Sequence, residues 1–478
     1  MSSIKKNFLY NVAYQLLLIL LPLITTPYVS RVLGAGGVGI YSYTYTVANY
    51  FMLIAMLGVK NYGNRGIAAV RDDPEALSRT FWEIYGLQLL CSTVTLVVYL
   101  IATAFLEPQI RLILVVQGIY VLTGLLDISW LFFGLEQFKL TVTRNILVKL
   151  ATLGCIFLFV RTPSDLWKYT LILVLGTLLS QSYLWLYLKR FVHWSRPTLR
   201  RMLRHLPGEL ILFVPVIAVS LYKMMDKIML RHMSSYAQVG FYESSEKILN
   251  IPTGIITALG TVMLPRMSNL AARSKDDQSL RYIRSSMSLT MFLACGMAFG
   301  IAGIAPRLVP IFLGEEYLYC IDLLIVLSPT VLFIAWANVI RTQYLIPHHH
   351  DRSYIISVVL GAVVNLIINA LLIPRMAAIG AAIGTVCAEA TVCLCQTLMV
   401  RKQLQIGTYL KEGLPFLVLG LGMYALLQGL SPLFHSHAVA LVALIGIGGS
   451  AYSCLSGLYY ILSHPDMADR LLRKLKRR

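Results

Sequence analysis

A group of charged side chains interrupts two neighbouring apolar stretches in the middle of the chain. Lys223 and Asp226 lie in the first of these stretches, and Glu243 and Lys247 lie in the second. A charge near the centre of a bilayer costs about 2.5–3.5 kcal/mol, so such residues usually face water, a charged partner or a ligand. Lys223 and Lys247 could therefore bind an anionic group in a wet cavity. Asp226 and Glu243 could bind a coupling ion, or pair with the lysines within their own helices.

Three further charged residues stand in other apolar stretches. Arg31 ends the first stretch beside several glycines, and it is either a cation of the same cavity or an anchor at the outer surface. Asp127 lies in the fourth stretch and Glu389 in the twelfth. An intramembrane carboxylate can bind a proton or a sodium ion, or it can hydrogen-bond a neighbouring helix. Asp127 could also pair with Lys149.

The apolar stretches are long enough to be membrane-spanning helices. The 478 residues are 57% hydrophobic and 13% charged, with a mean hydropathy of +0.71, whereas soluble domains carry about 25% charged residues. A spanning helix needs roughly 20 residues, and continuous apolar runs favour helices over a barrel. We predict an all-α polytopic membrane protein with about fourteen spans. They are 8–29, 40–62, 81–104, 111–133, 144–162, 167–188, 210–230, 238–264, 286–308, 320–343, 353–373, 379–400, 414–432 and 438–462.

A short sequence pattern occurs twice, at 31–41 and at 231–242. Each copy joins two apolar stretches, and six predicted spans separate the copies, so both have the same orientation. We therefore predict two pseudo-symmetric six-helix lobes around a central cavity, related by an axis along the membrane normal. The lobes are residues 1–205 and 206–408, and residues 409–478 add two helices and a basic tail.

The net charge of +19 follows the membrane topology and does not indicate nucleic-acid binding. Lys and Arg cluster in alternate short connections, which is the positive-inside pattern. This pattern places both termini in the cytoplasm. The basic tail at 470–478 is expected to lie against anionic lipid headgroups.

The sequence lacks the signatures of an enzyme, a cofactor site or a metal site. There is no nucleotide loop, zinc spacing or nucleophile triad, and the outer loops are too short for a polymerase site. His348, His349 and His350 are adjacent in a predicted cytoplasmic turn, where they cannot easily ligate one ion together. We expect no metal and no cofactor, apart from a proton or a sodium ion that intramembrane acids could couple to movement.

Several motifs together resemble the Wzx-type polysaccharide flippases of the multidrug/oligosaccharidyl-lipid/polysaccharide exporter superfamily. The resemblance covers both predicted lobes, from about residue 8 to 400. Its longest stretches read Thr26-Pro27-Tyr28-Val29-Ser30-Arg31-Val32-Leu33-Gly34 and Trp130-Leu131-Phe132-Phe133-Gly134-Leu135-Glu136. The shorter ones are 39–41, 57–59, 62–63, 157–160, 239–242, 312–317 and 380–384.

The resemblance implies a substrate and a location. The substrate would be an oligosaccharide repeat unit on undecaprenyl pyrophosphate, moved by alternating access from the cytoplasmic to the outer leaflet of the cell inner membrane. The product would supply O-antigen or capsule, and polysaccharide polymerase and chain-length proteins are the expected partners besides membrane lipids. Related flippases use cavity cations, for which Arg31, Lys223 and Lys247 are the candidates here.

Other functions fit the same class of fold. A drug or cation antiporter of the superfamily would favour a carboxylate-lined cavity with few basic groups, which the cations here argue against. A lipid II flippase would share the fold and the cationic cavity. A non-transporting scaffold would not need charges inside its spans.

Overall fold

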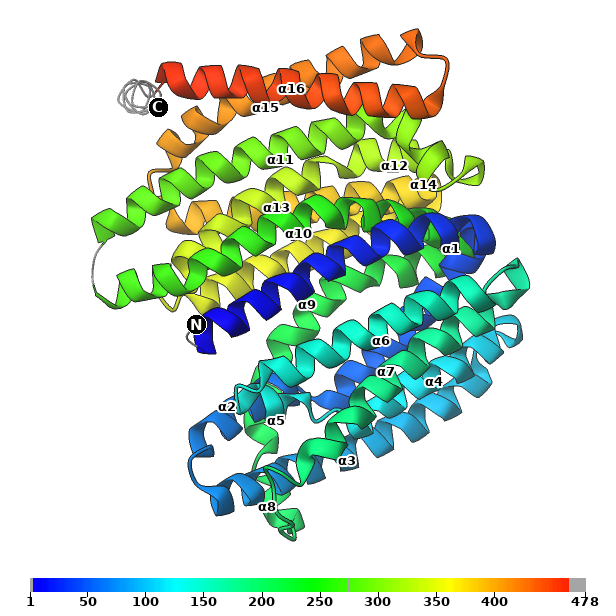
Figure 1. Ribbon diagram of the computed structural model, residues 1–478, viewed down its shortest axis with the longest axis vertical. Helices are drawn as coiled ribbons and strands as arrows, with labels where there is room; N and C mark the ends of the chain where they lie inside the picture. The colour runs from blue at the N-terminus through cyan, green and yellow to red at the C-terminus, as the bar shows by residue number, and fades with distance from the viewer. Residues whose placement is uncertain (1–2, 274–275, 464–478) are drawn as a thin grey trace. The chain divides into compact units, whose positions relative to one another are not determined.

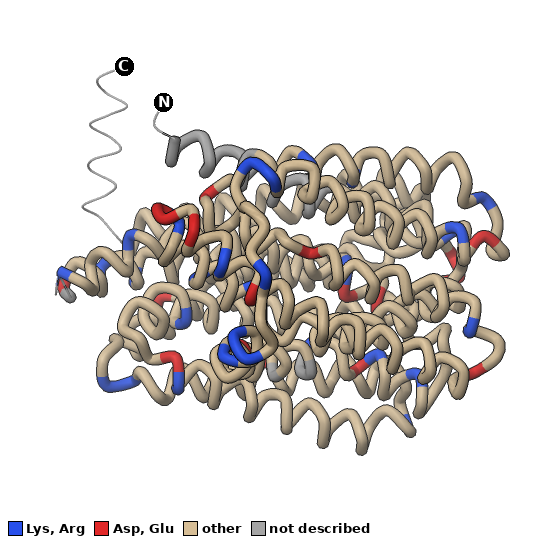
Figure 2. Tube along the Cα trace, turned by 90° about the horizontal axis from the view of Figure 1, so that it is seen from below, with Lys and Arg blue, Asp and Glu red and all other residues tan. Residues whose placement is uncertain are grey.

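The structure is a computed structural model that describes residues 3–273 and 276–463. Every regular element in these two ranges is a helix, which confirms the all-α class. Ten of the described helices are long and apolar enough to cross a membrane. Figure 2 shows that most of their length carries neither basic nor acidic residues. The chain is therefore a multi-pass membrane protein.

The chain divides into two compact units, Met1–Glu243 and Ser244–Arg478. The first unit holds nine helices among the described residues and the start of a tenth (Figure 1). They are α1 (Ser3–Met56), α2 (Val59–Val70), α3 (Pro74–Phe105), α4 (Arg111–Leu126), α5 (Ser129–Gly134), α6 (Phe138–Phe159), α7 (Leu166–Leu188), α8 (Leu199–Leu203), α9 (Leu206–Met233) and α10 (Tyr236–Ala272). The predicted lobe limits at 205 and 408 remain a prediction.

The long helix α1 contains the first predicted span and most of the second. It breaks at Gly34, whose φ of 67° and ψ of 174° are not helical. Such a positive φ suits glycine, which has no Cβ to clash with the backbone. After Met56, Leu57 and Gly58 also take positive φ values, of 38° and 82°, so the chain turns before α2 begins.

The predicted span 111–133 is two helices. α4 ends at Leu126, and α5 starts at Ser129. Asp127 stands in the break with a φ of −77° and a ψ of 91°, and its Oδ1 accepts hydrogen bonds from the Ser129 backbone N–H at 3.0 Å and from the Ser129 hydroxyl at 2.5 Å. A carboxylate that bonds the backbone two residues ahead competes with helix formation, which explains the break.

The helices of the first unit pack through a few repeated pairings. α4 contacts α1, α3 and α7, and α6 contacts α1 and α7. Figure 1 shows α3, α4, α6 and α7 side by side. Phe81, Trp130 and Phe132 are fully buried in a core beside this group, so the short α5 is held by large aromatic side chains.

The duplicated pattern brings two glycines into contact. A Cβ on Gly39 of α1 would overlap the carbonyl oxygen of Tyr236 and stand 2.6 Å from its carbonyl carbon. A Cβ on Gly240 of α10 would overlap the carbonyl oxygen of Ala35 in the same way. These glycines hold equivalent positions in the copies, after Val38 and Val239. The copies therefore cross backbone to backbone.

The second unit continues α10 and adds six further helices among its described residues. They are α11 (Asp276–Phe312), α12 (Cys320–Leu327), α13 (Pro329–Ile340), α14 (Asp351–Val400), α15 (Ile406–Leu430) and α16 (His437–Ser463). α14 breaks at Ala377, with a φ of 48° and a ψ of −126°, so it contains both predicted spans 353–373 and 379–400. α11 packs against α13, α15 and α16, and Arg284 of α11 pairs with Glu412 of α15.

Candidate functional site

The first unit contains an open cavity of about 650 Å³ whose lining combines apolar residues with charged and polar side chains. Its walls come from α1, α2, α5, α6, α7 and the break before α5. The charged lining residues are the cations Lys60, Arg144 and Lys149 and the acid Asp127. Three positive charges and one negative charge give this lining a formal net charge of +2. Such a cavity favours an anionic or strongly hydrogen-bonding molecule.

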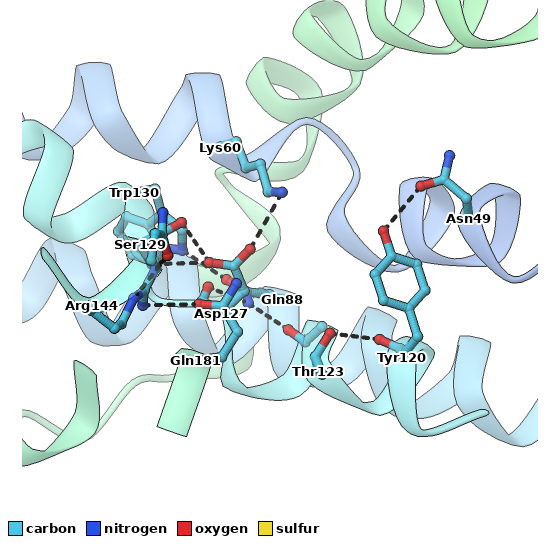
Figure 3. Close-up of polar contacts among 12 residues, drawn as sticks. Asn49, Lys60, Gln88, Tyr120, Thr123, Asp127, Ser129, Trp130, Arg144 and Gln181 are labelled. Carbon is cyan, nitrogen blue, oxygen red and sulfur yellow. Dashed lines mark hydrogen bonds and ion pairs between the residues drawn. The ribbon is translucent and has the colours of Figure 1, made fainter. Parts of the chain in front are cut away.

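Asp127 is held from several sides at the inner wall of this cavity. Its side chain is buried, and its Oδ2 lies 3.4 Å from Nζ of Lys60. The backbone oxygen of Asp127 accepts a hydrogen bond of 2.9 Å from Gln88, whose Oε1 accepts one of 2.9 Å from the Trp130 indole (Figure 3). Together with the two hydrogen bonds from Ser129, these contacts fix the Asp127 carboxylate. The neighbouring cation, Lys60, can move, because its side chain is 60% exposed.

Arg144 provides a buried cation on the part of the wall that α6 forms. Only 6% of the residue is exposed. Its guanidinium donates hydrogen bonds to the Ser180 backbone oxygen at 2.7 Å, to Asn145 Oδ1 at 2.9 Å and to Gln181 Oε1 at 3.4 Å. These acceptors orient the guanidinium between α6 and α7.

None of these three cations was a predicted headgroup ligand, and Lys149 was considered only as a possible partner of Asp127. Lys60 lies near the end of the predicted span 40–62 and Arg144 at the start of the span 144–162, and both belong to the basic residues that produce the positive-inside pattern. The chain turns at Leu57 and Gly58, so Lys60 lies at the start of α2, where it lines the cavity. α6 begins at Phe138, so Arg144 lies inside this helix and also lines the cavity. The expected partner of Asp127, Lys149, lines the same cavity, but the ion pair of Asp127 is made by Lys60.

The acids predicted in the middle of the chain belong to a different cluster of the first unit. Lys227 is 9% exposed, and its Nζ lies 2.5 Å from Glu243 Oε2. Ser42 also donates to Glu243, at 2.8 Å, and the Tyr242 hydroxyl donates to Asp226 at 2.7 Å. Asp226 and Glu243 thus lie with Lys227, which the sequence analysis did not select.

The remaining predicted residues have separate positions. Arg31 is an exposed residue of α1 three positions before the break at Gly34, and Lys223 is exposed on α9. Lys247 and Glu389 are half-buried residues of the second unit. Their roles as headgroup or coupling-ion ligands stay predictions.

The second copy of the pattern anchors a loop. Arg231 donates to Glu107 Oε1 at 2.5 Å and stacks over the Tyr236 ring at 4.1 Å, while the Tyr236 hydroxyl donates to Glu107 Oε2 at 2.9 Å. The Arg231 hydrogen bond holds the pKa of Glu107, in the loop after α3, below its ordinary value.

The Glu107 contact predicts an acid-sensitive contribution to stability. Because the folded-state pKa of Glu107 is lowered, its contribution is present above the ordinary glutamate pKa and is lost as the pH falls through the lowered value. The side chain is partly exposed, so the effect should stay below about 1 kcal/mol. Thermal unfolding in detergent should show wild type losing slightly more stability than Glu107→Gln between neutral and acidic pH. An identical loss in both proteins would contradict this assignment.

The fold and the cavity define a polytopic helical membrane protein with the exporter architecture. A solved structure of the lipid II flippase MurJ, in an inward closed conformation, matches with a TM-score of 0.69 at 14% identity, over 92% of this chain and 98% of that one. A multidrug resistance MATE family transporter, in an inward-facing conformation, matches with a TM-score of 0.59 at 14% identity, over 82% and 96% of the two chains. At such identities these likenesses show the fold alone.

The sequence places the chain more narrowly. The chain belongs to the polysaccharide biosynthesis protein family, whose sequence model matches residues 4–271. A protein of Escherichia coli (strain K12) whose name describes it as an O-antigen transporter is 27% identical over 411 residues, which are 83% of this chain and 96% of that protein. These matches confirm the resemblance to polysaccharide flippases that the sequence motifs indicated.

Proposed function

We propose that the chain is a flippase for lipid-linked oligosaccharide repeat units, which it moves from the cytoplasmic to the outer leaflet of the cell inner membrane. The product would supply a surface polysaccharide such as O-antigen or capsule. The observation that carries the proposal is the cavity of about 650 Å³ whose lining combines Lys60, Arg144 and Lys149 with Asp127. The family and its O-antigen transporter relative support it.

The lining suits the charged end of an undecaprenyl-pyrophosphate-linked sugar. A pyrophosphate forms strong charge-assisted hydrogen bonds with guanidinium and ammonium groups. Sugar hydroxyls would cost several kcal/mol each in hydrocarbon without partners, and Asn145, Thr177 and Gln181 provide such partners in the cavity. The cavity fits the phosphates and adjoining sugar, while the polyprenyl tail stays in the lipid.

The Lys60–Asp127 ion pair can be exchanged for an ion pair between Lys60 and the substrate. Asp127 Oδ2 lies 3.4 Å from the Lys60 Nζ in the structure. An incoming pyrophosphate competes with Asp127 for this exposed lysine, and its departure lets the pair form again. Alternating access would then carry the bound headgroup across the membrane.

Deleting the gene tests the function directly. The deletion should abolish the surface polysaccharide and cause an undecaprenyl-pyrophosphate-linked oligosaccharide to accumulate in the inner leaflet. Restoration by the wild-type gene completes the test. Rescue of a strain depleted of its lipid II flippase, with no effect on surface polysaccharide, would instead assign the alternative substrate; drug sensitivity as the sole phenotype would assign an antiporter.

The proposed direction of transport also requires a defined topology. We expect both termini in the cytoplasm. A C-terminal reporter that is active only in the cytoplasm should therefore be active when fused after residue 478. Activity of a reporter that works only outside the membrane, at the same position, would contradict the topology.

A further inference from the structure

A fully buried carboxyl group lies near the start of α9, away from the cavity. Glu209 is 0% exposed, and neither of its side-chain oxygens has a hydrogen-bond partner among the residues that the structure describes. A buried carboxylate without a donor loses its hydration and gains nothing in return. The neutral acid is therefore the form that this packing stabilises.

The surroundings of Glu209 come from the turn after α1 and from α2 and α3. A Cβ on Gly58, in that turn, would stand 2.9 Å from the Glu209 backbone oxygen, and the Tyr62 ring of α2 lies against Gly208. Tyr62 and Cys91 of α3 are close enough to interact electrostatically with the carboxyl group. Neither side chain supplies a positive charge that would favour the ionised form.

A line of hydrogen-bonding groups connects this site with the protein surface. The Tyr62 hydroxyl lies 2.9 Å from His205 Nδ1, and His205 Nε2 lies 3.3 Å from Glu83 Oε2. Glu83 Oε1 lies 3.8 Å from Nη1 of Arg201, whose side chain is 59% exposed. The charge of Arg204 also acts on Tyr62. Imidazole, carboxylate and phenol groups in sequence can pass a proton.

His205, a member of this hydrogen-bonded line, lies one helical turn before Glu209. The backbone N–H of Glu209 donates to the His205 oxygen at 3.1 Å, so the two residues share the first turn of α9. α9 packs against α1 and α2, and α8 packs against α3. Figure 1 shows α2, α8 and the beginnings of α3 and α9 at one end of the first unit. Ionisation of Glu209 would therefore act where α9 meets the α1–α2 turn.

We propose that Glu209 is a proton-binding site that couples the protonation of the first unit to the packing of α9 against α2. A proton from water passes along Glu83, His205 and Tyr62, and a movement that brings the Tyr62 hydroxyl to the Glu209 carboxylate, which has no hydrogen-bond partner in the described residues, completes its conversion to the neutral acid; the reverse step returns the proton to water. No other bond forms or breaks. The neutral acid favours close packing, and the carboxylate favours separation that admits water. Its use in transport rests on the proposed function.

Infrared difference spectroscopy of the full-length protein in lipid nanodiscs tests the site without substrate. Wild type at neutral pH should show the C=O band of a buried protonated carboxyl group, and this band should disappear as the pH rises. The band should be absent from Glu209→Gln and should titrate at a shifted midpoint in Glu209→Asp. Glu75→Gln, at an exposed glutamate of α3, should leave it unchanged.

A transport assay completes the test. In proteoliposomes, a pH gradient should speed wild-type transport of the lipid-linked oligosaccharide at least about threefold and leave Glu209→Gln unaffected, while that variant retains transport without a gradient. A titrating band that persists in Glu209→Gln, or a wild-type carboxylate that stays ionised at every pH, would overturn the inference. A titrating Glu209 in a protein that does not move the oligosaccharide would reject the proposed substrate and its transport role while leaving the proton site established.

Discussion

Replacing Arg144 with alanine should abolish the surface polysaccharide while the protein remains in the membrane. The substitution removes a buried cation from the cavity, and losing such a hydrogen-bonded charge costs about 2–5 kcal/mol of binding. Transport should therefore fall by about 30-fold or more. Quantifying surface polysaccharide, with protein level checked by immunoblot, measures the effect.

Matched variants separate binding from structure. Arg161→Ala removes an exposed arginine just beyond the end of α6 and should be nearly silent. Because Arg144 also joins α6 to α7 through Ser180 and Gln181, its loss could disturb packing. Lys149→Ala removes a cation of the same cavity without touching those bonds, and it should also reduce transport. Normal polysaccharide in both Arg144→Ala and Lys149→Ala would remove the cavity from the mechanism.

Replacing Gly39 with alanine should be far more damaging than replacing Gly36. The two glycines lie in the same half of α1, but a Cβ on Gly36 would meet nothing within 4 Å, whereas one on Gly39 would overlap the Tyr236 carbonyl. Overpacking against backbone costs about 1–3 kcal/mol or more. Alanine at an unhindered helical glycine instead gains up to about 1 kcal/mol from helix propensity.

The two substitutions should therefore have opposite signs. We expect Gly39→Ala to lower the thermal unfolding midpoint and to impair polysaccharide export, and Gly36→Ala to leave both unchanged or slightly improved. Gly240→Ala, the equivalent change in the second copy, should behave like Gly39→Ala. Equal effects at Gly36 and Gly39 would show that the close crossing is not important for the working protein.

The helical framework could be predicted from the sequence because apolar length is a strong signal. Most predicted spans lie largely within one helix, whereas 111–133 and 320–343 are each divided between two helices. The breaks at Gly34 and Ala377 separate pairs of spans that form single long helices. Hydropathy does not predict the break at Asp127. It registers an aspartate only as a polar residue and carries no information about the backbone geometry. Its hydrogen bonds to Ser129 end α4.

The site was harder to predict because it depends on which residues meet across distant helices. Asp127 was selected for its buried position, but Lys60 and Arg144 stand near helix ends, where basic residues also mark membrane topology. Lys227 and its partner Glu243 lie on different helices, so the sequence alone does not show that they meet. Glu209 adjoins a basic connection in sequence, so nothing in composition indicated that its carboxyl group is buried.

The crossing at Gly39 and Gly240 provides a point of contact about which α1 can rotate. Two backbones in direct contact leave little room to slide, but they can rotate about the point of contact. The bend at Gly34 lies five residues away, or about 7.5 Å along the helix. A small rotation at this pivot would be amplified towards Leu21 and Thr25, the α1 residues that line the cationic cavity. The duplicated pattern would thereby convert a change in helix angle into a change in cavity width.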